Sequence, residues 1–140
     1  MFRIKYCREI AFKLLYEIDV LPLPLPGETE MVPPGQQLLQ DHLDFFRGLN
    51  NREKQFILTI LQKTRENKKS IDQLIADNLI GWKLERLMVV DRNLLRMGIA
   101  ESYINDQKAI IIDDIVRIAK KYGGEESYKI INAVLDKVLK

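Results

Sequence analysis

Residues 109–139 read AIIIDDIVRIAKKYGGEESYKIINAVLDKVL and contain two apolar runs, interleaved with charges, on either side of a pair of glycines. In the second run the apolar residues repeat at helical spacing, which is typical of an amphipathic helix. Gly123-Gly124 stands where a helix that ends on a left-handed C-cap needs glycine. The two glutamates that follow suit the first turn of another helix because of its dipole. The stretch therefore predicts a helix over 109–122, a glycine stop and a helix over 125–139.

Similar spacing extends helical structure to most of the chain. The other predicted helices cover residues 3–19, 36–48, 51–79, 84–88 and 91–103. The polar run 64–70 is expected to form an exposed turn of one long helix or a bend in it, and Asp91 is the expected N-cap of the helix that it opens. No strand pattern or internal repeat stands out. We therefore expect an all-α fold of about seven helices, in one compact bundle or in two packed sub-bundles.

A proline-rich segment at about residues 20–35 interrupts this pattern. It holds all five prolines of the protein together with Gly27 and Gly35. Proline has no amide hydrogen to donate and restricts the residue before it, so the segment is predicted to be a loop. A length of 140 residues fits one compact domain. Residues 1–140 are therefore expected to form a single domain that carries this loop.

The charges are nearly balanced overall but unevenly distributed. The formal net charge is +2, so any affinity for nucleic acid must come from the placement of the basic residues rather than from their sum. No Lys or Arg occurs between Lys13 and Arg47, whereas basic residues cluster near the N-terminus, in the middle of the chain and towards the C-terminus. Ordinary solvated helix faces would account for any one of these clusters.

The residues give no sign of a catalytic, metal-binding or membrane-spanning element. The single histidine, His42, lies among apolar positions, and Cys7 lies on the apolar face of the first predicted helix, where a buried small side chain is expected. Asp113-Asp114 is better explained as a solvated helix face. No apolar run approaches the roughly 20 residues of a membrane span, and a single cysteine suits a reducing compartment. We expect a cytoplasmic protein that is not an enzyme, has no cofactor or metal, and has no membrane contact.

The first predicted helix has a second face beside its apolar one. Arg8, Phe12 and Tyr16 are spaced by four and form a stripe along the helix, with Lys5 on the same side. One explanation is that a neighbouring helix or the proline loop covers the aromatic rings. The other is a composite surface, on which the basic end meets phosphates and the aromatic end meets a partner protein.

A second candidate surface surrounds the pair of glycines. Lys120 and Lys121 close one predicted helix, and Ser127, Tyr128 and Lys129 open the next. Lysines, a ring that can stack on a base and free amides at a helix N-terminus are the groups that RNA contacts use. This second surface is therefore a candidate RNA contact.

Four segments resemble the signature of the NusB family. They are residues 82–87 (WKLERL), 91–101 (DRNLLRMGIAE), 118–123 (IAKKYG) and 129–136 (KIINAVLD). Arg8-Glu9 and Leu15-Tyr16 also match the first helix of the family. The spacing stays in register from there to the C-terminus, so the resemblance covers nearly the whole chain.

The resemblance implies an all-α fold of two helical sub-bundles that binds the boxA element of nascent ribosomal RNA. It also implies a heterodimer with NusE, a ribosomal protein of the small subunit, that helps the RNA polymerase elongation complex to read through terminators. The matched positions assign the RNA surface to Lys5, Arg8, Lys121, Ser127, Lys129 and Ile130. The NusE surface would use Tyr16 and the region around Glu85. Phe12 of the stripe is a further predicted contact with the partner protein.

The chain departs from the family pattern at several positions. Ile4 and Tyr6 stand where the first helix of the family often has arginines. Ile130 replaces a common Phe whose ring could stack on a base, and Ala133 replaces a usual Gly. Tyr128 is a candidate for supplying the missing ring. We therefore expect weaker RNA binding by the protein alone and a greater dependence on its partner.

Two other functions are compatible with the residues. One is a helical protein-interaction module without an RNA role, in which the basic clusters serve only solubility. The other is an RNA-modifying enzyme, because NusB-like domains are also fused to RNA methyltransferases, although such an enzyme needs a cofactor domain of its own. The oligomeric state is open, and a homodimer could bury the surface of the first helix.

Overall fold

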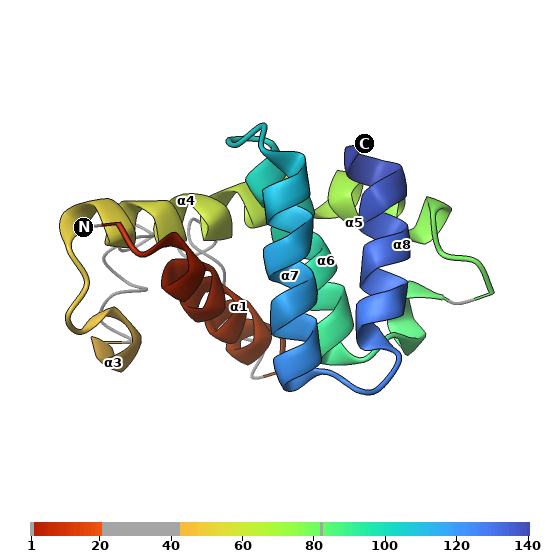
Figure 1. Cartoon of the computed structure of the whole chain (residues 1–140), viewed down its shortest axis with the longest axis horizontal. Coiled ribbons are helices and arrows are strands. Elements are labelled where there is room, and N and C mark those ends of the chain that lie inside the picture. Colours follow the sequence, from red (N-terminus) through yellow and green to blue (C-terminus); the bar gives the residue numbers. More distant parts are fainter. Residues whose placement is uncertain (1, 21–42, 82) are drawn as a thin grey trace. The chain divides into compact units, whose positions relative to one another are not determined.

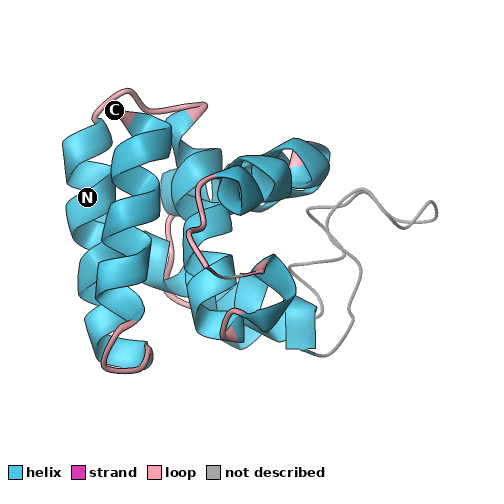
Figure 2. Ribbon diagram, turned by 90° about the vertical axis from the view of Figure 1, so that its right-hand side faces the viewer, coloured by secondary structure: helices cyan, strands magenta, loops and turns pink. Residues whose placement is uncertain are grey.

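The computed structural model describes residues 2–20, 43–81 and 83–140 of the chain. These residues form seven α-helices and one short 3-10 helix, and no strand occurs among them (Figure 2). The predicted all-α fold is confirmed. Residues 21–35 of the proline-rich loop, residues 36–42 of the next predicted helix with His42, and Trp82 lie outside the described residues.

The helices fall into two compact units, Met1–Glu66 and Asn67–Lys140, which we call the N-terminal and C-terminal units. The N-terminal unit contains α1 (Ile4–Val20), α3 (Leu43–Phe46) and α4 (Asn51–Glu66), of which α1 packs against α4 (Figure 1). The side chains of Leu14, Ile57 and Leu61 are completely buried. The helix predicted for residues 3–19 is present as α1, shifted by one residue at each end.

The start of α4 is fixed by a reciprocal pair of hydrogen bonds. The amide of Glu53 donates to the Asn50 side-chain oxygen at 2.9 Å, and the amide of Asn50 donates to the Glu53 carboxylate at 3.1 Å. This arrangement is a capping box, which satisfies two amides that the helix itself leaves without partners.

The long helix predicted for residues 51–79 is two helices. α4 ends at Glu66, Asn67 intervenes, and α5 covers Lys68–Asp77. Thr64, in the last turn of α4, is buried, and its hydroxyl donates to the Ile60 carbonyl at 2.8 Å, a bond that often bends helices. The polar run 64–70 therefore contains the boundary between the two units.

The C-terminal unit is built around α6 (Val89–Ser102), α7 (Lys108–Tyr122) and α8 (Ser127–Leu139). Each of these three helices packs against the other two, and α5 packs against α6 and α8 (Figure 1). Nearly every residue of α6 after Arg92 is buried, so α6 is the central helix of the unit. At Gly98 an added Cβ would lie 3.3 Å from Leu135 of α8, so glycine allows α6 and α8 to approach closely.

Two predicted helix starts in this unit are displaced. The helix predicted to start at an Asp91 cap begins at Val89 instead, with Met88 as its N-cap, and Asp91 is buried in its first turn. The segment predicted as a helix over 84–88 is the 3-10 helix η1 (Leu84–Arg86). None of the described helices is long and apolar enough to cross a membrane.

Candidate nucleic-acid interface

The turn between α7 and α8 needs glycine at position 123 because a side chain would clash there, and not because the backbone is left-handed. Gly123 has φ −90° and ψ −174°, so the predicted left-handed cap is absent. A Cβ at this position would lie 2.5 Å from the Ser127 hydroxyl and 2.8 Å from the Ala119 carbonyl oxygen. The start predicted at residue 125 was also wrong, because the turn continues to Glu126 and α8 begins at Ser127.

Ser127 holds this turn together. Its side chain is 2% exposed, and its hydroxyl accepts the amide of Gly124 at 2.9 Å. The hydroxyl also donates to the carboxylate of Asp91 on α6. Burial raises the pKa of Asp91, and the hydrogen bond from Ser127 offsets part of that rise. The other oxygen of Asp91, Oδ1, has no hydrogen-bond partner in the described part of the chain.

The same turn brings basic and aromatic side chains together. The Lys120 ammonium lies 5.0 Å from the centre of the Tyr128 ring, and the Lys129 ammonium lies 6.0 Å from it. Lys121 lies 5.3 Å from the Tyr122 ring. Glu126 pairs with Lys129 at 3.2 Å and raises the pKa of that lysine. The structure thus places Lys121, Lys129 and Tyr128 around one turn, as the sequence suggested.

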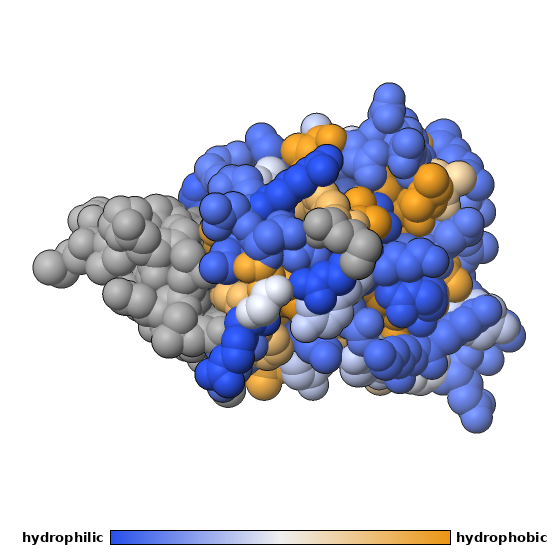
Figure 3. All heavy atoms as spheres, turned by 60° about the vertical axis from the view of Figure 1, so that its left-hand side comes forward, coloured by the Kyte–Doolittle hydropathy of each residue, from blue (hydrophilic) through white to orange (hydrophobic). Residues whose placement is uncertain are grey.

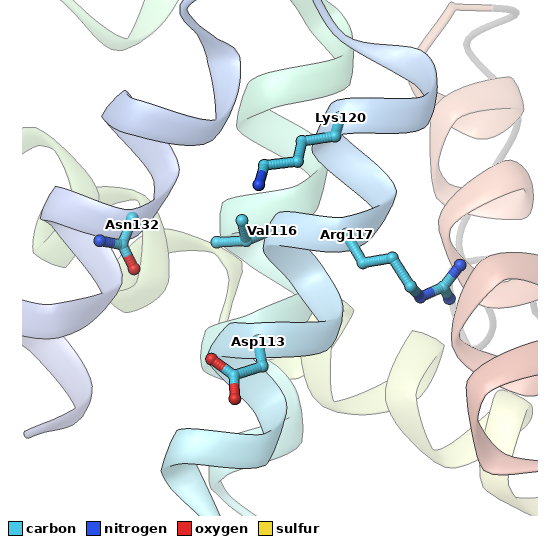
Figure 4. Close-up of a pocket in the computed structure, with 5 residues that line it drawn as sticks. All are labelled: Asp113, Val116, Arg117, Lys120 and Asn132. Carbon is cyan, nitrogen blue, oxygen red and sulfur yellow. The ribbon is translucent and has the colours of Figure 1, made fainter.

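Two grooves flank α8. The α7–α8 groove has a volume of about 400 Å³ and is lined by Asp113, Val116, Arg117, Lys120 and Asn132. In Figure 4 Val116 on α7 and Asn132 on α8 lie on opposite sides of this groove, whereas Arg117 points away from Asn132. The α5–α8 groove has a volume of about 230 Å³ and is lined by Asn78, Leu79, Ile80, Lys129, Ile130, Ala133, Val134 and Lys137.

Tyr128 and Ile130 therefore belong to opposite flanks of α8. Two helical residues apart correspond to about 200° around the axis. Ile130 is half-buried in the α5–α8 groove, while Asn132, one turn after Tyr128, faces the α7–α8 groove. The two side chains cannot serve as one stacking surface.

The predicted stripe on α1 is only partly exposed. Lys5 is exposed and Tyr16 is 39% exposed, but Arg8 is 1% and Phe12 is 3% exposed. The rings of Phe12 and Tyr16 lie 6.2 Å apart. The continuous surface expected from the spacing of four is therefore absent, because the buried arc of α1 extends over the middle of the stripe.

A network around Glu53 occupies the N-terminal end of α1. The Glu53 carboxylate accepts guanidinium hydrogen bonds from Arg3 at 2.9 and 3.0 Å, and these bonds lower the pKa of Glu53 to about 2. The Cys7 thiol lies 3.8 Å from the same carboxylate, and burial raises its pKa to about 11. Arg3 thus belongs to an internal ion pair, while Lys5 remains exposed.

This network around Glu53 was not among the predicted sites. The motif of Asn followed three residues later by Glu could have revealed the cap at Asn50 and Glu53. The bond of Glu53 to Arg3 joins residues 50 positions apart, so no local pattern indicates it.

The remaining predicted partner residue is Glu85. It is exposed in η1 of the C-terminal unit. On the face drawn in Figure 3 hydrophilic side chains cover most of the described surface, with apolar areas scattered between them.

Within the described residues there is no group of three or more His, Cys, Asp or Glu side chains that could hold a metal ion.

Comparison with known proteins identifies relatives over almost the whole chain. The model of the NusB family matches residues 6–140. The transcription antitermination protein NusB of Syntrophomonas wolfei is 35% identical over 134 residues, covering 94% of this chain and 92% of the relative. That of Borreliella burgdorferi is 35% identical over 144 residues, covering 95% and 91%.

Solved structures agree with these relatives. NusB of T. maritima superimposes with a TM-score of 0.79 at 29% identity, covering 99% of this chain and 92% of that one. A chain from a crystal structure of the antitermination factors NusB and NusE in complex with double-stranded RNA superimposes with a TM-score of 0.79 at 28% identity, covering 99% and 98%.

Proposed function

Because this chain belongs to the NusB family, we propose that it is a transcription antitermination protein that binds the boxA element of nascent ribosomal RNA as a heterodimer with NusE. The observation that carries the proposal is the similarity, over 99% of this chain, to a chain from the complex of NusB, NusE and RNA. The protein would then act by binding rather than by catalysis, in the cytoplasm, as part of the RNA polymerase elongation complex.

The exposed basic residues would supply the affinity for RNA. Lys5, Lys121 and Lys129 are exposed and can neutralise phosphates, and Ile130 can pack on a base from its groove. Arg8 and Ser127 are also proposed to bind RNA, but both are buried. Contact of these two side chains with RNA therefore requires the surrounding segments to move.

NusE would contact an aromatic residue of the N-terminal unit and an acidic residue of the C-terminal unit. Tyr16 is exposed on α1, with Phe12 buried beside it, and Glu85 is exposed in η1. Exposed aromatic rings are enriched at protein interfaces. A homodimer that buries the exposed side chains of Tyr6, Tyr16 and Val20 on α1 is the alternative use of this surface. Light scattering with and without NusE distinguishes the two. A homodimer that persists in the NusE complex would contradict the idea that NusE and the second copy bind the same surface of α1.

Read-through of a terminator tests the proposed function directly. A template with boxA upstream of a terminator is transcribed by a reconstituted elongation complex with and without this protein. We expect read-through to rise only when the protein, NusE and an intact boxA are all present. Equal read-through on a template with permuted boxA would contradict the proposal.

A further inference from the structure

The structure assigns a base-binding subsite to the mouth of the α7–α8 groove, and this inference rests on the proposed function. An unpaired RNA base stacks on Tyr128, the adjoining phosphates lie on Lys120 and Lys129, and the Asn132 amide meets the edge of the base. Ile130 lies on the opposite flank of α8 and contacts a different nucleotide.

The groove has the composition of a nucleotide site. Val116 supplies an apolar wall on α7, and Asn132 lies on the opposite side of the groove on α8 (Figure 4). An amide carries both donors and an acceptor, which is what the edge of an unpaired base requires. The volume of about 400 Å³ lies within the usual range of small-ligand pockets.

The Tyr128 ring has two lysine ammonium groups near it. It is half-buried, with the ammonium groups of Lys120 and Lys129 at 5.0 and 6.0 Å from its centre. Both lysines are exposed, so each gains little from that contact and can turn towards a phosphate. A base can then take its place, because every base has a face that stacks on an aromatic ring.

The charges along the groove give the nucleotide a direction. Lys120 lies at the Tyr128 end, whereas Asp113 is exposed two turns earlier on α7. Arg117 lies between them but points away from Asn132 and pairs with Asp114 at 2.7 Å. A phosphate is therefore attracted to the Lys120 end and repelled from the Asp113 end.

Substitutions of Tyr128 test the subsite. Binding of a labelled boxA RNA is measured by fluorescence anisotropy with the full chain and NusE at one fixed salt concentration. Tyr128→Leu is expected to weaken binding about tenfold, because it removes the stacking ring. Tyr128→Phe keeps the ring and is expected to bind within about twofold of the wild type. Neither variant should change the salt dependence, since neither removes a charge.

Matched variants separate this subsite from general effects. Tyr103→Leu removes another exposed tyrosine of the same unit, next to the opposite end of α7, and should leave RNA binding unchanged. Lys120→Ala should reduce the slope of log K against log salt by about one. Circular dichroism and thermal unfolding establish that each variant is folded.

The possible failures are distinguishable. If the wild type does not prefer boxA RNA, the proposed function itself fails. If the wild type binds but Tyr128→Leu binds equally well, the subsite is wrong and the proposed function stands. If Tyr128→Phe loses as much affinity as Tyr128→Leu, the hydroxyl rather than the ring makes the contact, and stacking is overturned.

Discussion

The hydroxyl of Ser127 accepts the backbone amide of Gly124 at 2.9 Å and so closes the turn between α7 and α8. The same hydroxyl donates to the buried carboxylate of Asp91, which ties the start of α8 to α6. Lys121 and Lys129 stand on either side of this turn. The geometry of the candidate RNA surface therefore depends on a side chain that is itself buried.

Ser127→Ala is expected to lower the free energy of unfolding by about 1–3 kcal/mol, because it leaves the buried Asp91 carboxylate without this donor and removes the acceptor of the Gly124 amide. Urea denaturation measures this loss. Ser70→Ala removes an exposed hydroxyl bond to the Asn67 carbonyl and should cost less than about 0.5 kcal/mol. If Ser127→Ala weakens RNA binding at unchanged stability, Ser127 acts on RNA directly rather than through the turn.

The two neighbouring glycines are expected to respond differently to alanine. At Gly123 the new Cβ would lie 2.8 Å from the Ala119 carbonyl oxygen as well as against Ser127, so the backbone must shift, and Gly123→Ala should cost about 1–3 kcal/mol. At Gly124 the nearest atom is the Met88 sulfur at 3.5 Å, an ordinary contact. Thermal unfolding of both variants compares them, and equal losses would show that the close packing at Gly123 is not what matters.

The ion pair of Arg3 and Glu53 should make the protein sensitive to acid. The hydrogen bonds from Arg3 hold the pKa of Glu53 at about 2, whereas a glutamate in the unfolded chain has a pKa of about 4.3. A lowered folded-state pKa stabilises the protein above pH 4.3, and this stabilisation is lost as the pH falls towards 2. Arg3→Ala should therefore lower Tm at neutral pH and flatten its dependence on pH between 2 and 5.

Arg47→Ala is the control for this titration. Arg47 pairs with Asp44 at 3.1 Å, but both side chains are exposed, so the pair contributes little. A pH profile of Arg3→Ala that parallels that of Arg47→Ala would show that Glu53 does not need Arg3.

The lysines around the α7–α8 turn should determine the salt dependence of RNA binding. Replacing Lys121 or Lys129 with Ala is expected to weaken binding to all RNA sequences and to reduce the salt slope by about one for each lysine. Lys108→Ala changes an exposed lysine at the opposite end of α7 and should leave the slope unchanged. Titrations at several salt concentrations measure these slopes, and an unchanged slope for Lys129→Ala would remove that lysine from the RNA surface.

Most helices could be predicted because each buries an apolar face of regular spacing, as residues 4–18 and 131–139 do. Their ends were harder to predict, since they depend on contacts that spacing does not show. Asp91 looks like a cap but is buried in the first turn of α6, where it meets Ser127 of α8, which lies far away in the sequence. Gly123 looks like a left-handed cap but is required by the closeness of Ser127.

The candidate site shows the same division. The lysines and the ring near residues 120–129 could be found because helical spacing brings them to one turn. The burial of Arg8 and Phe12 could not be predicted from the sequence. Their spacing places both residues beside the core face, and tertiary contacts decide whether they are covered. Helix geometry predicts that Tyr128 and Ile130 lie on opposite flanks of α8. The grooves beside these flanks could not be predicted, because they form only when α5, α7 and α8 pack together.

The most direct test of the central claim is the affinity of the purified protein for boxA RNA and for a permuted RNA of equal length and composition, each with and without NusE. We expect the boxA RNA to bind more tightly than the permuted RNA, and NusE to increase that difference. Equal affinity for the two RNAs, unchanged by NusE, would contradict the assignment of this protein as a boxA-binding antitermination factor.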